Sequence, residues 1–264
     1  FDQTIYLNTE TKQFSFPGLN IVSIRNGLHR RAGAASWSAC LKHALDQIPD
    51  KPILYMQEDY FLTKEVKAGL IEHFAGVLVR ENIDCIHLTT IASAGPFSDA
   101  GIENLQITDR FAGYRISLQP ALWKKSALRE TLRSHENPWM LEKYGTLRSR
   151  YMSQKICNVR IDKFNNPDNA IFSYIFTGII KGKWHDGMGQ LAKEQGLTID
   201  FSERGFFSER KIPPLPIRAL NKIRPAVVIN TVRSQMGVFR LKLIHYARTR
   251  LNLCLKFRTK PQNQ

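Results

Sequence analysis

Pro52-Ile53-Leu54-Tyr55-Met56-Gln57-Glu58-Asp59-Tyr60-Phe61-Leu62 indicates the fold more clearly than any other part of the chain. Its apolar run at 53–56 has the length and the β-branched or aromatic content of a buried strand. Two adjacent carboxylates, Glu58 and Asp59, separate it from a second apolar run at 60–62. Since open α/β sheets bind ligands beyond the carboxyl ends of their strands, the pattern predicts both acids at a ligand-binding edge.

The two carboxylates allow two interpretations. Burying them unpaired costs several kcal/mol, so something cationic or water must meet them. Their hard oxygen atoms suit a divalent cation, and through it a diphosphate, which makes Glu58 and Asp59 candidate ligands of Mg²⁺ or Mn²⁺. The alternative is a strand end whose acids face water or pair with Lys and Arg side chains. The two residues alone leave both interpretations open.

Strand-like and helix-like patterns alternate along the first third of the chain. We expect strands at 3–8, 19–25 and 83–88, and helices at 36–48 and 63–80. Ser36 and Thr63 are the predicted N-caps of the two helices. This β-α-β-α-β order predicts an α/β fold with a largely parallel sheet flanked by helices.

Later patterns are weaker. Residues 89–106 are rich in Ala, Gly, Ser and Asp, and we interpret them as a mobile loop that covers substrate. Further strands are expected at 111–118, 156–161 and 171–180, and helices at 124–133 and 187–195. Asn137 and Pro138 predict the start of another helix, with Asn as its N-cap and Pro at its first position.

Three side chains in this part of the chain have a functional and a structural interpretation. Glu142 shares one helix face with Trp139, but the helix dipole also favours a carboxylate in the first turns. Arg148 is placed to meet a diphosphate, yet basic residues near a helix C-terminus are common without function. Lys183 follows Gly182 at a strand end, where it either faces phosphate or simply faces water.

The acidic stretch is one of five motifs that occur in a recognisable order. The other four are Trp37-Ser38, Ser117-Leu118-Gln119-Pro120-Ala121-Leu122-Trp123, Trp139-Met140-Leu141-Glu142 and Gly182-Lys183-Trp184. Together they resemble GT-A-type glycosyltransferases, in particular the bacterial enzymes of surface-polysaccharide (lipopolysaccharide or capsule) biosynthesis. The likeness spans about residues 4 to 205.

The resemblance implies an α/β, GT-A-like (Rossmann-like) domain at 1–209. The family usually has one more strand before the point at which this chain starts, so we expect the domain to lack its first strand. It also implies transfer of a sugar from a nucleotide-sugar donor to a hydroxyl of a cell-surface glycan or a lipid-linked acceptor. A nucleotidyltransferase on a similar fold is an alternative within the enzymes.

The resemblance also implies roles for individual residues. Asp59, supported by Glu58, would hold Mg²⁺ or Mn²⁺ on the donor diphosphate, which Lys183 would also face. Glu142 would be the general base that takes the acceptor proton. The expected substrate-binding residues are Ser117, Gln119, Trp139 and Arg148.

Basic charge is concentrated at the C-terminus. Residues 210–264 hold thirteen of the 38 Lys and Arg residues and no Asp or Glu. The other 25 basic residues and all 23 acidic residues lie in 1–209, so this part is nearly neutral. Such an asymmetry indicates a polyanionic partner, either a nucleic acid or an anionic membrane surface.

The same C-terminal extension carries an amphipathic pattern. Val228, Val232, Met236, Phe239, Leu243 and Tyr246 recur at helical spacing, flanked by Arg233, Arg240 and Lys242. This pattern is typical of a helix in a membrane interface, and we expect that helix to end near Thr249. A nucleic-acid-binding arm is the alternative, disfavoured because no stacking platform accompanies the charge.

The location follows from these features. Four scattered cysteines without a C-x-x-C pair are compatible with a reducing cytoplasm. We therefore expect a cytoplasmic protein that is peripherally associated with the inner face of the cell membrane. The alternative from a different functional class is a non-catalytic basic adaptor that binds nucleic acid or membrane through 210–264.

Overall fold

A mixed six-stranded sheet forms the centre of the computed structural model. The structure describes residues 3–9, 11–25, 36–175, 177–208 and 225–258, and for residues 250–258 it describes the backbone alone. The strands in spatial order are β3 (Ile53–Tyr55), β8 (Ala121–Trp123), β5 (Cys85–His87), β9 (Ile156–Val159), β7 (Leu105–Gly113) and β6 (Gly95–Asp99). Only β5 and β9 pair in parallel within this sheet; the other four pairs are antiparallel. The α/β class is confirmed, and the expectation of a largely parallel sheet is wrong.

Two segments explain the mixed pairing. Strand β8 runs back between β3 and β5, which therefore point in the same direction without being neighbours. The segment that we interpreted as a loop at 89–106 instead supplies β6 and the start of β7, which form a hairpin. Of the strand expected at 111–118, only 111–113 belong to a strand, the end of β7, and 114–118 form a turn and irregular backbone before β8 begins at Ala121. Tyr114 separates the two with a positive φ of 52°.

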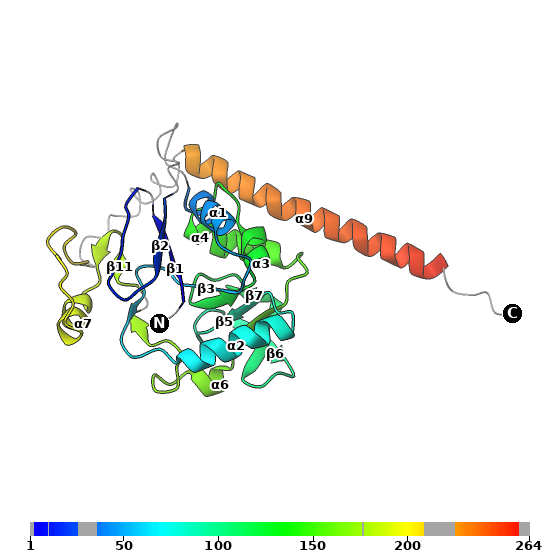
Figure 1. Cartoon of the computed structure of the whole chain (residues 1–264). Helices are drawn as coiled ribbons and strands as arrows, with labels where there is room; N and C mark the ends of the chain where they lie inside the picture. The colour runs from blue at the N-terminus through cyan, green and yellow to red at the C-terminus, as the bar shows by residue number, and fades with distance from the viewer. Residues whose placement is uncertain (1–2, 10, 26–35, 176, 209–224, 259–264) are drawn as a thin grey trace.

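Helices cover both faces of this sheet (Figure 1). They are α1 (Trp37–Gln47), α2 (Ala68–Arg80), α3 (Lys125–Thr131) and α6 (Ile161–Phe164). The Ser36 hydroxyl oxygen accepts the Ala39 N–H at 3.1 Å, which confirms it as the N-cap of α1. Helix α2 begins later than expected, after Lys67, because the Thr63 N–H donates to the Ser173 carbonyl at 2.7 Å instead of entering a helix.

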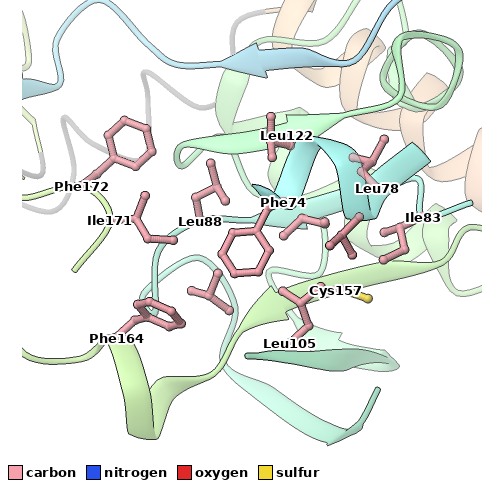
Figure 2. Packing of buried hydrophobic residues seen from close by; sticks show 13 residues of the cluster. Phe74, Leu78, Ile83, Leu88, Leu105, Leu122, Cys157, Phe164, Ile171 and Phe172 are labelled. Carbon is pink, nitrogen blue, oxygen red and sulfur yellow. The ribbon is translucent and has the colours of Figure 1, made fainter. Parts of the chain in front are cut away.

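Alternation along the strands divides the core into two clusters. Ile86 and Cys157 face a cluster that includes Phe74 and Leu78 of α2, shown in Figure 2. The neighbouring Cys85 and Ile156 face the other cluster, which includes side chains from α1 and α3. The central strands β5, β8 and β9 are therefore buried on both faces, which is why they read as apolar runs, whereas the edge strand β3, which we expected to be buried, is only partly so.

Three small two-stranded sheets lie beside the central one. They are β1 (Ile5–Thr9) with β2 (Ile21–Arg25), β4 (Phe61–Leu62) with β10 (Tyr174–Ile175), and β11 (Ile179–Ile180) with β12 (Lys183–Trp184). The long strand expected at 171–180 is thus two short ones in different sheets. Helix α7 (Met188–Glu194) follows, and Gly196, at φ 63°, terminates that helical region as expected.

The Trp139-Met140-Leu141-Glu142 motif lies on a continuous helical segment. It comprises α4 (Pro138–Met140), the π-helix η2 (Leu141–Gly145) and α5 (Thr146–Ser149). The Asn137 side chain accepts the Met140 N–H at 2.9 Å, so the predicted N-cap is confirmed.

The C-terminal extension forms α9 (Pro225–Arg258), longer than the helix expected to end near Thr249. In Figure 1 it lies on the side of α1, α3 and α4, and its C-terminal part projects beyond the body. Within the described ranges, no helix combines the length and the apolar character needed to cross a bilayer. The division of the chain at residue 209 stays a prediction.

Candidate active site

Asp59 lies in the turn that connects β3 to β4. Its Oδ2 accepts the Thr177 hydroxyl at 2.6 Å, and its backbone carbonyl accepts the Gly178 N–H at 2.7 Å. Its Oδ1 is buried and has no hydrogen-bond partner among the described residues. Glu58, next to it, is exposed. One Asp59 oxygen is therefore held by the protein, and the other is a buried acceptor without a protein partner among the described residues, whereas buried polar atoms are normally satisfied.

Gly178 makes the close approach of the two segments feasible. A Cβ at this position would lie 2.5 Å from the Phe61 ring and 3.2 Å from the Asp59 carbonyl oxygen. The same segment leads into the β11–β12 hairpin, where Trp184 contacts Phe61 edge-on with ring centroids 6.1 Å apart. The structure therefore brings the Gly182-Lys183-Trp184 motif to the acidic turn, with Lys183 exposed.

Glu142 lies in the first turn of the π-helix η2 and is half-buried. Its Oε1 accepts the Leu118 N–H at 3.0 Å and the Ser117 hydroxyl at 3.4 Å. Burial raises the pKa of Glu142, while these two hydrogen bonds oppose the rise. A carboxylate with a raised pKa is a better proton acceptor, and π-helical turns occur frequently at functional sites. Glu142 thus has the properties of a general base.

Two tyrosines connect the acidic turn to Glu142. The Tyr60 hydroxyl donates to the Leu118 carbonyl at 3.2 Å, and the Gln119 amide donates to the Tyr60 oxygen at 3.2 Å. The Tyr174 hydroxyl in turn donates to the Gln119 side-chain carbonyl. Because Leu118 also holds Glu142, this network links the turn after β3 to the π-helix.

Ser117 and Gln119 were expected to line the cleft as substrate-binding residues. Both are buried, and their polar atoms are engaged with Glu142 and with the two tyrosines. Their contacts are those of residues that position other side chains. The structure thus gives the side chains of Ser117 and Gln119 an internal role.

The carboxylates also raise the pKa values of Tyr60 and of a third tyrosine, Tyr55. Burial raises the pKa of Tyr55, and the nearby Tyr60, Glu58, Glu142 and Asp59 raise it further. The pKa of Tyr60 is also raised, first by burial and then by Tyr174 and these carboxylates. All three carboxylates therefore lie close enough to these two tyrosines to raise their pKa values.

A groove of about 400 Å³ opens beside Glu142. It is lined by Gly113, Tyr114, Trp139, Glu142, Lys143 and Thr146. Trp139 is 76% exposed, and it shares the groove with Glu142 as their spacing predicted. Tyr114, which was not among the expected site residues, also lines the groove, and its left-handed backbone conformation is the kind of local strain that concentrates at functional sites.

Arg148 does not reach this site. Its side chain is fully buried, and its guanidinium donates to the two oxygens of Glu136 at 2.5 and 2.6 Å and to the Thr131 carbonyl at 3.0 Å. The expectation that Arg148 binds a diphosphate is therefore corrected. The position of an arginine on a helix does not show whether its guanidinium forms a buried ion pair with a carboxylate. The sequence therefore could not distinguish a structural ion pair from a diphosphate-binding arginine.

Glu58 and Asp59 remain the candidate metal ligands. In the part of the chain that the structure describes, no group of three or more His, Cys, Asp or Glu side chains could hold a metal ion. Mg²⁺ in diphosphate sites typically takes one or two carboxylates and completes its coordination with phosphate oxygens and water. The unpaired Oδ1 of Asp59 and the exposed carboxylate beside it fit that requirement.

The chain shows no significant match to family models, to curated proteins or to solved structures. The assignment of a function therefore depends on the residues and contacts of the chain itself. These are the unpaired Asp59 oxygen, the raised pKa of Glu142 and the network between them.

Proposed function

We propose that the chain is a glycosyltransferase that moves a sugar from a nucleotide-sugar donor to a hydroxyl of a cell-surface glycan or a lipid-linked acceptor. One observation carries the proposal: a carboxylate with an unpaired buried oxygen, Asp59, is linked through Tyr60 and Leu118 to a carboxylate with a raised pKa, Glu142. Glycosyl transfer needs these two functions, an anchor for a diphosphate leaving group and an acceptor for the hydroxyl proton. The order of the five sequence motifs supports the same function.

On the donor side, Asp59 and Glu58 would hold Mg²⁺ or Mn²⁺, which offsets the charge that develops on the leaving nucleoside diphosphate. Thr177 and Gly178 keep the Asp59 turn in place through its other oxygen and its carbonyl. Lys183, exposed on the adjoining hairpin, supplies a positive charge for the phosphates.

On the acceptor side, Glu142 takes the proton of the attacking hydroxyl as the new glycosidic bond forms and the bond to the diphosphate breaks. The hydrogen bonds from Leu118 and Ser117 hold one carboxylate oxygen in place. Trp139, at the mouth of the same groove, supplies an apolar face for a sugar ring.

The test is product formation with a panel of nucleotide sugars, Mn²⁺ and a mixture of lipid-linked and free glycan acceptors. We expect release of a nucleoside diphosphate together with a larger glycan, detected by mass spectrometry. Glu142→Gln and Asp59→Asn should each lower the rate at least about a hundredfold, in the range found when a general acid–base group is lost.

The matched controls are Glu103→Gln and Asp50→Asn, which make the same changes at exposed positions outside the site. Both should keep the wild-type rate. Unchanged activity in the Glu142 and Asp59 variants would contradict the proposal. So would formation of a nucleotide sugar from a sugar phosphate, which is the outcome expected of a nucleotidyltransferase.

A further inference from the structure

Helix α9 presents an apolar stripe to solvent. The stripe, called the outer stripe, consists of Val228, Val232, Met236, Phe239 and Leu243. Their exposed fractions are 46, 46, 66, 61 and 53%. At 3.6 residues per turn, the five side chains fall within an arc of about 80°. Large apolar side chains that are aligned and exposed over several turns mark an interaction surface.

The opposite face of α9 attaches the helix to the body. The Ser234 hydroxyl is buried and donates to the Glu136 carboxylate at 2.7 Å, and His135 Nε2 lies 3.0 Å from the same hydroxyl oxygen. Further along, His245 contacts the Tyr151 ring at 5.8 Å between centroids. Around the helix axis, Ser234 lies about 160° and His245 about 140° from the middle of the outer stripe. The stripe therefore points away from the body.

Positive charge borders the outer stripe. Arg233 and Arg240 lie on one flank and Lys242 on the other, and all three are exposed. Residues 210–264 contain thirteen basic and no acidic residues. A second copy of the chain would bring the same positive charge to the stripe, so like charges oppose a symmetric dimer through this face. The charge instead complements an anionic surface.

We infer that the outer stripe of α9 docks on an anionic lipid bilayer, with the helix lying in the plane of the interface. The apolar side chains enter the boundary between headgroups and acyl chains, and the flanking Arg and Lys side chains reach anionic headgroups. A nucleic acid would use the charge but has no use for a continuous apolar stripe. The inference goes beyond the proposed function and does not depend on it.

The attachment of α9 through Ser234 also bears on how the body is oriented at the membrane. Because α9 is hydrogen-bonded to the residues just before α4, a docked helix holds the body at a fixed orientation next to the membrane. The α4–η2 segment, which carries Trp139 and Glu142, follows these residues directly. The groove is therefore kept near the surface on which a lipid-linked molecule would be presented.

Vesicle co-sedimentation of the full chain tests the inference. One set of vesicles contains phosphatidylcholine alone, and the other contains phosphatidylcholine mixed with phosphatidylglycerol. We expect at least about tenfold tighter binding to the anionic set, since each basic residue near an anionic surface contributes about fivefold. Phe239→Glu should weaken that binding by about tenfold or more, through the loss of one buried aromatic side chain and the added negative charge.

Ala226→Glu is the matched control, because it adds the same charge to an exposed position of α9 about 80° beyond the edge of the outer stripe. It should bind like the wild type or within a few-fold, and circular dichroism should show that both variants are folded. Equal binding of Phe239→Glu and wild type would overturn the inference. A lipid-free dimer that Phe239→Glu dissociates, or tight RNA binding that this variant retains without any vesicle binding, would overturn it as well.

Discussion

Glu136 and Glu142 lie on either side of the start of α4, and their carboxylates have opposite surroundings. Both oxygens of Glu136 accept hydrogen bonds from Arg148, and one also accepts the Ser234 hydroxyl, all of them buried. Glu142 is half-buried, its Oε1 is held by Leu118 and Ser117, and burial raises its pKa. The first carboxylate is therefore bound within the structure through both oxygens, whereas the second has one oxygen held and a pKa raised by burial.

Arg148→Met, which breaks the ion pair of Glu136, should have the largest effect on the free energy of unfolding. Removing the guanidinium leaves the Glu136 carboxylate buried and without its ion pair, so the free energy of unfolding should fall by about 3–5 kcal/mol. Urea denaturation measures it. The double variant Arg148→Met/Glu136→Leu should recover much of the loss, because no uncompensated charge remains. A single variant that loses less than about 1 kcal/mol would show that the pair is not a structural element.

Gly178→Ala tests the support of Asp59, the other carboxylate of the site. The added Cβ would meet Phe61 and the Asp59 carbonyl, so we expect a loss of about 1–3 kcal/mol, as for overpacked sites. Thermal denaturation measures the loss. Gly76→Ala is the control, since a Cβ there meets nothing within 4 Å and lies in α2, where alanine should stabilise by about 0.5–1 kcal/mol. Equal effects of the two changes would mean that the approach at Gly178 is not tight.

Ser234→Ala should reduce stability by about 1.5 kcal/mol, the contribution of a hydrogen bond to a charged group. The effect is smaller than that of Arg148→Met because Glu136 keeps its arginine. Ser126→Ala, at an exposed position of α3, should change stability little. If chemical denaturation finds the two serine variants alike, α9 is not attached to the body through this contact.

Glu142→Gln should slightly stabilise the fold at neutral pH, by less than about 1 kcal/mol. The folded-state pKa of Glu142 lies above its ordinary value of 4.5, so the wild type loses stability as pH rises from 4.5 through the raised pKa. Glutamine does not titrate, and its carbonyl can still accept the Leu118 N–H. The difference in melting temperature between variant and wild type should therefore disappear below about pH 4.5. If the variant were less stable than the wild type at pH 7, the surroundings of Glu142 would favour its charged form, and the raised pKa would be contradicted.

Local features of the fold could be predicted because they depend on short segments. Ser36 and Asn137 cap helices as expected, since a cap needs only its own side chain and the next three residues. The apolar run before Glu58 is a strand for a similar reason. These predictions hold for elements whose hydrogen bonds close within the element or at its end.

Long-range pairing could not be predicted from the same patterns. Nothing in Ala121–Trp123 indicates that this segment pairs antiparallel with both β3 and β5. Residues 89–106 have the composition of a loop, although part of this segment forms a hairpin of β6 and β7. The same limit applies to the site. Trp139 and Glu142 share a groove because they lie on one helix face. The partner of Arg148 lies outside its helical segment, twelve residues earlier, and the inward contact of Gln119 with Tyr60 joins positions 59 residues apart.

Thermal denaturation with nucleotide sugars and Mn²⁺ tests the central claim, that Asp59 anchors a metal–diphosphate group beside Glu142. The account predicts that one class of nucleotide raises the melting temperature of the wild type only when Mn²⁺ is present, with about 2.7 kcal/mol of stabilisation at a hundred times the Kd. Asp59→Asn should abolish this rise, and Asp50→Asn should keep it. A rise that persists without Mn²⁺ and in Asp59→Asn would contradict the account.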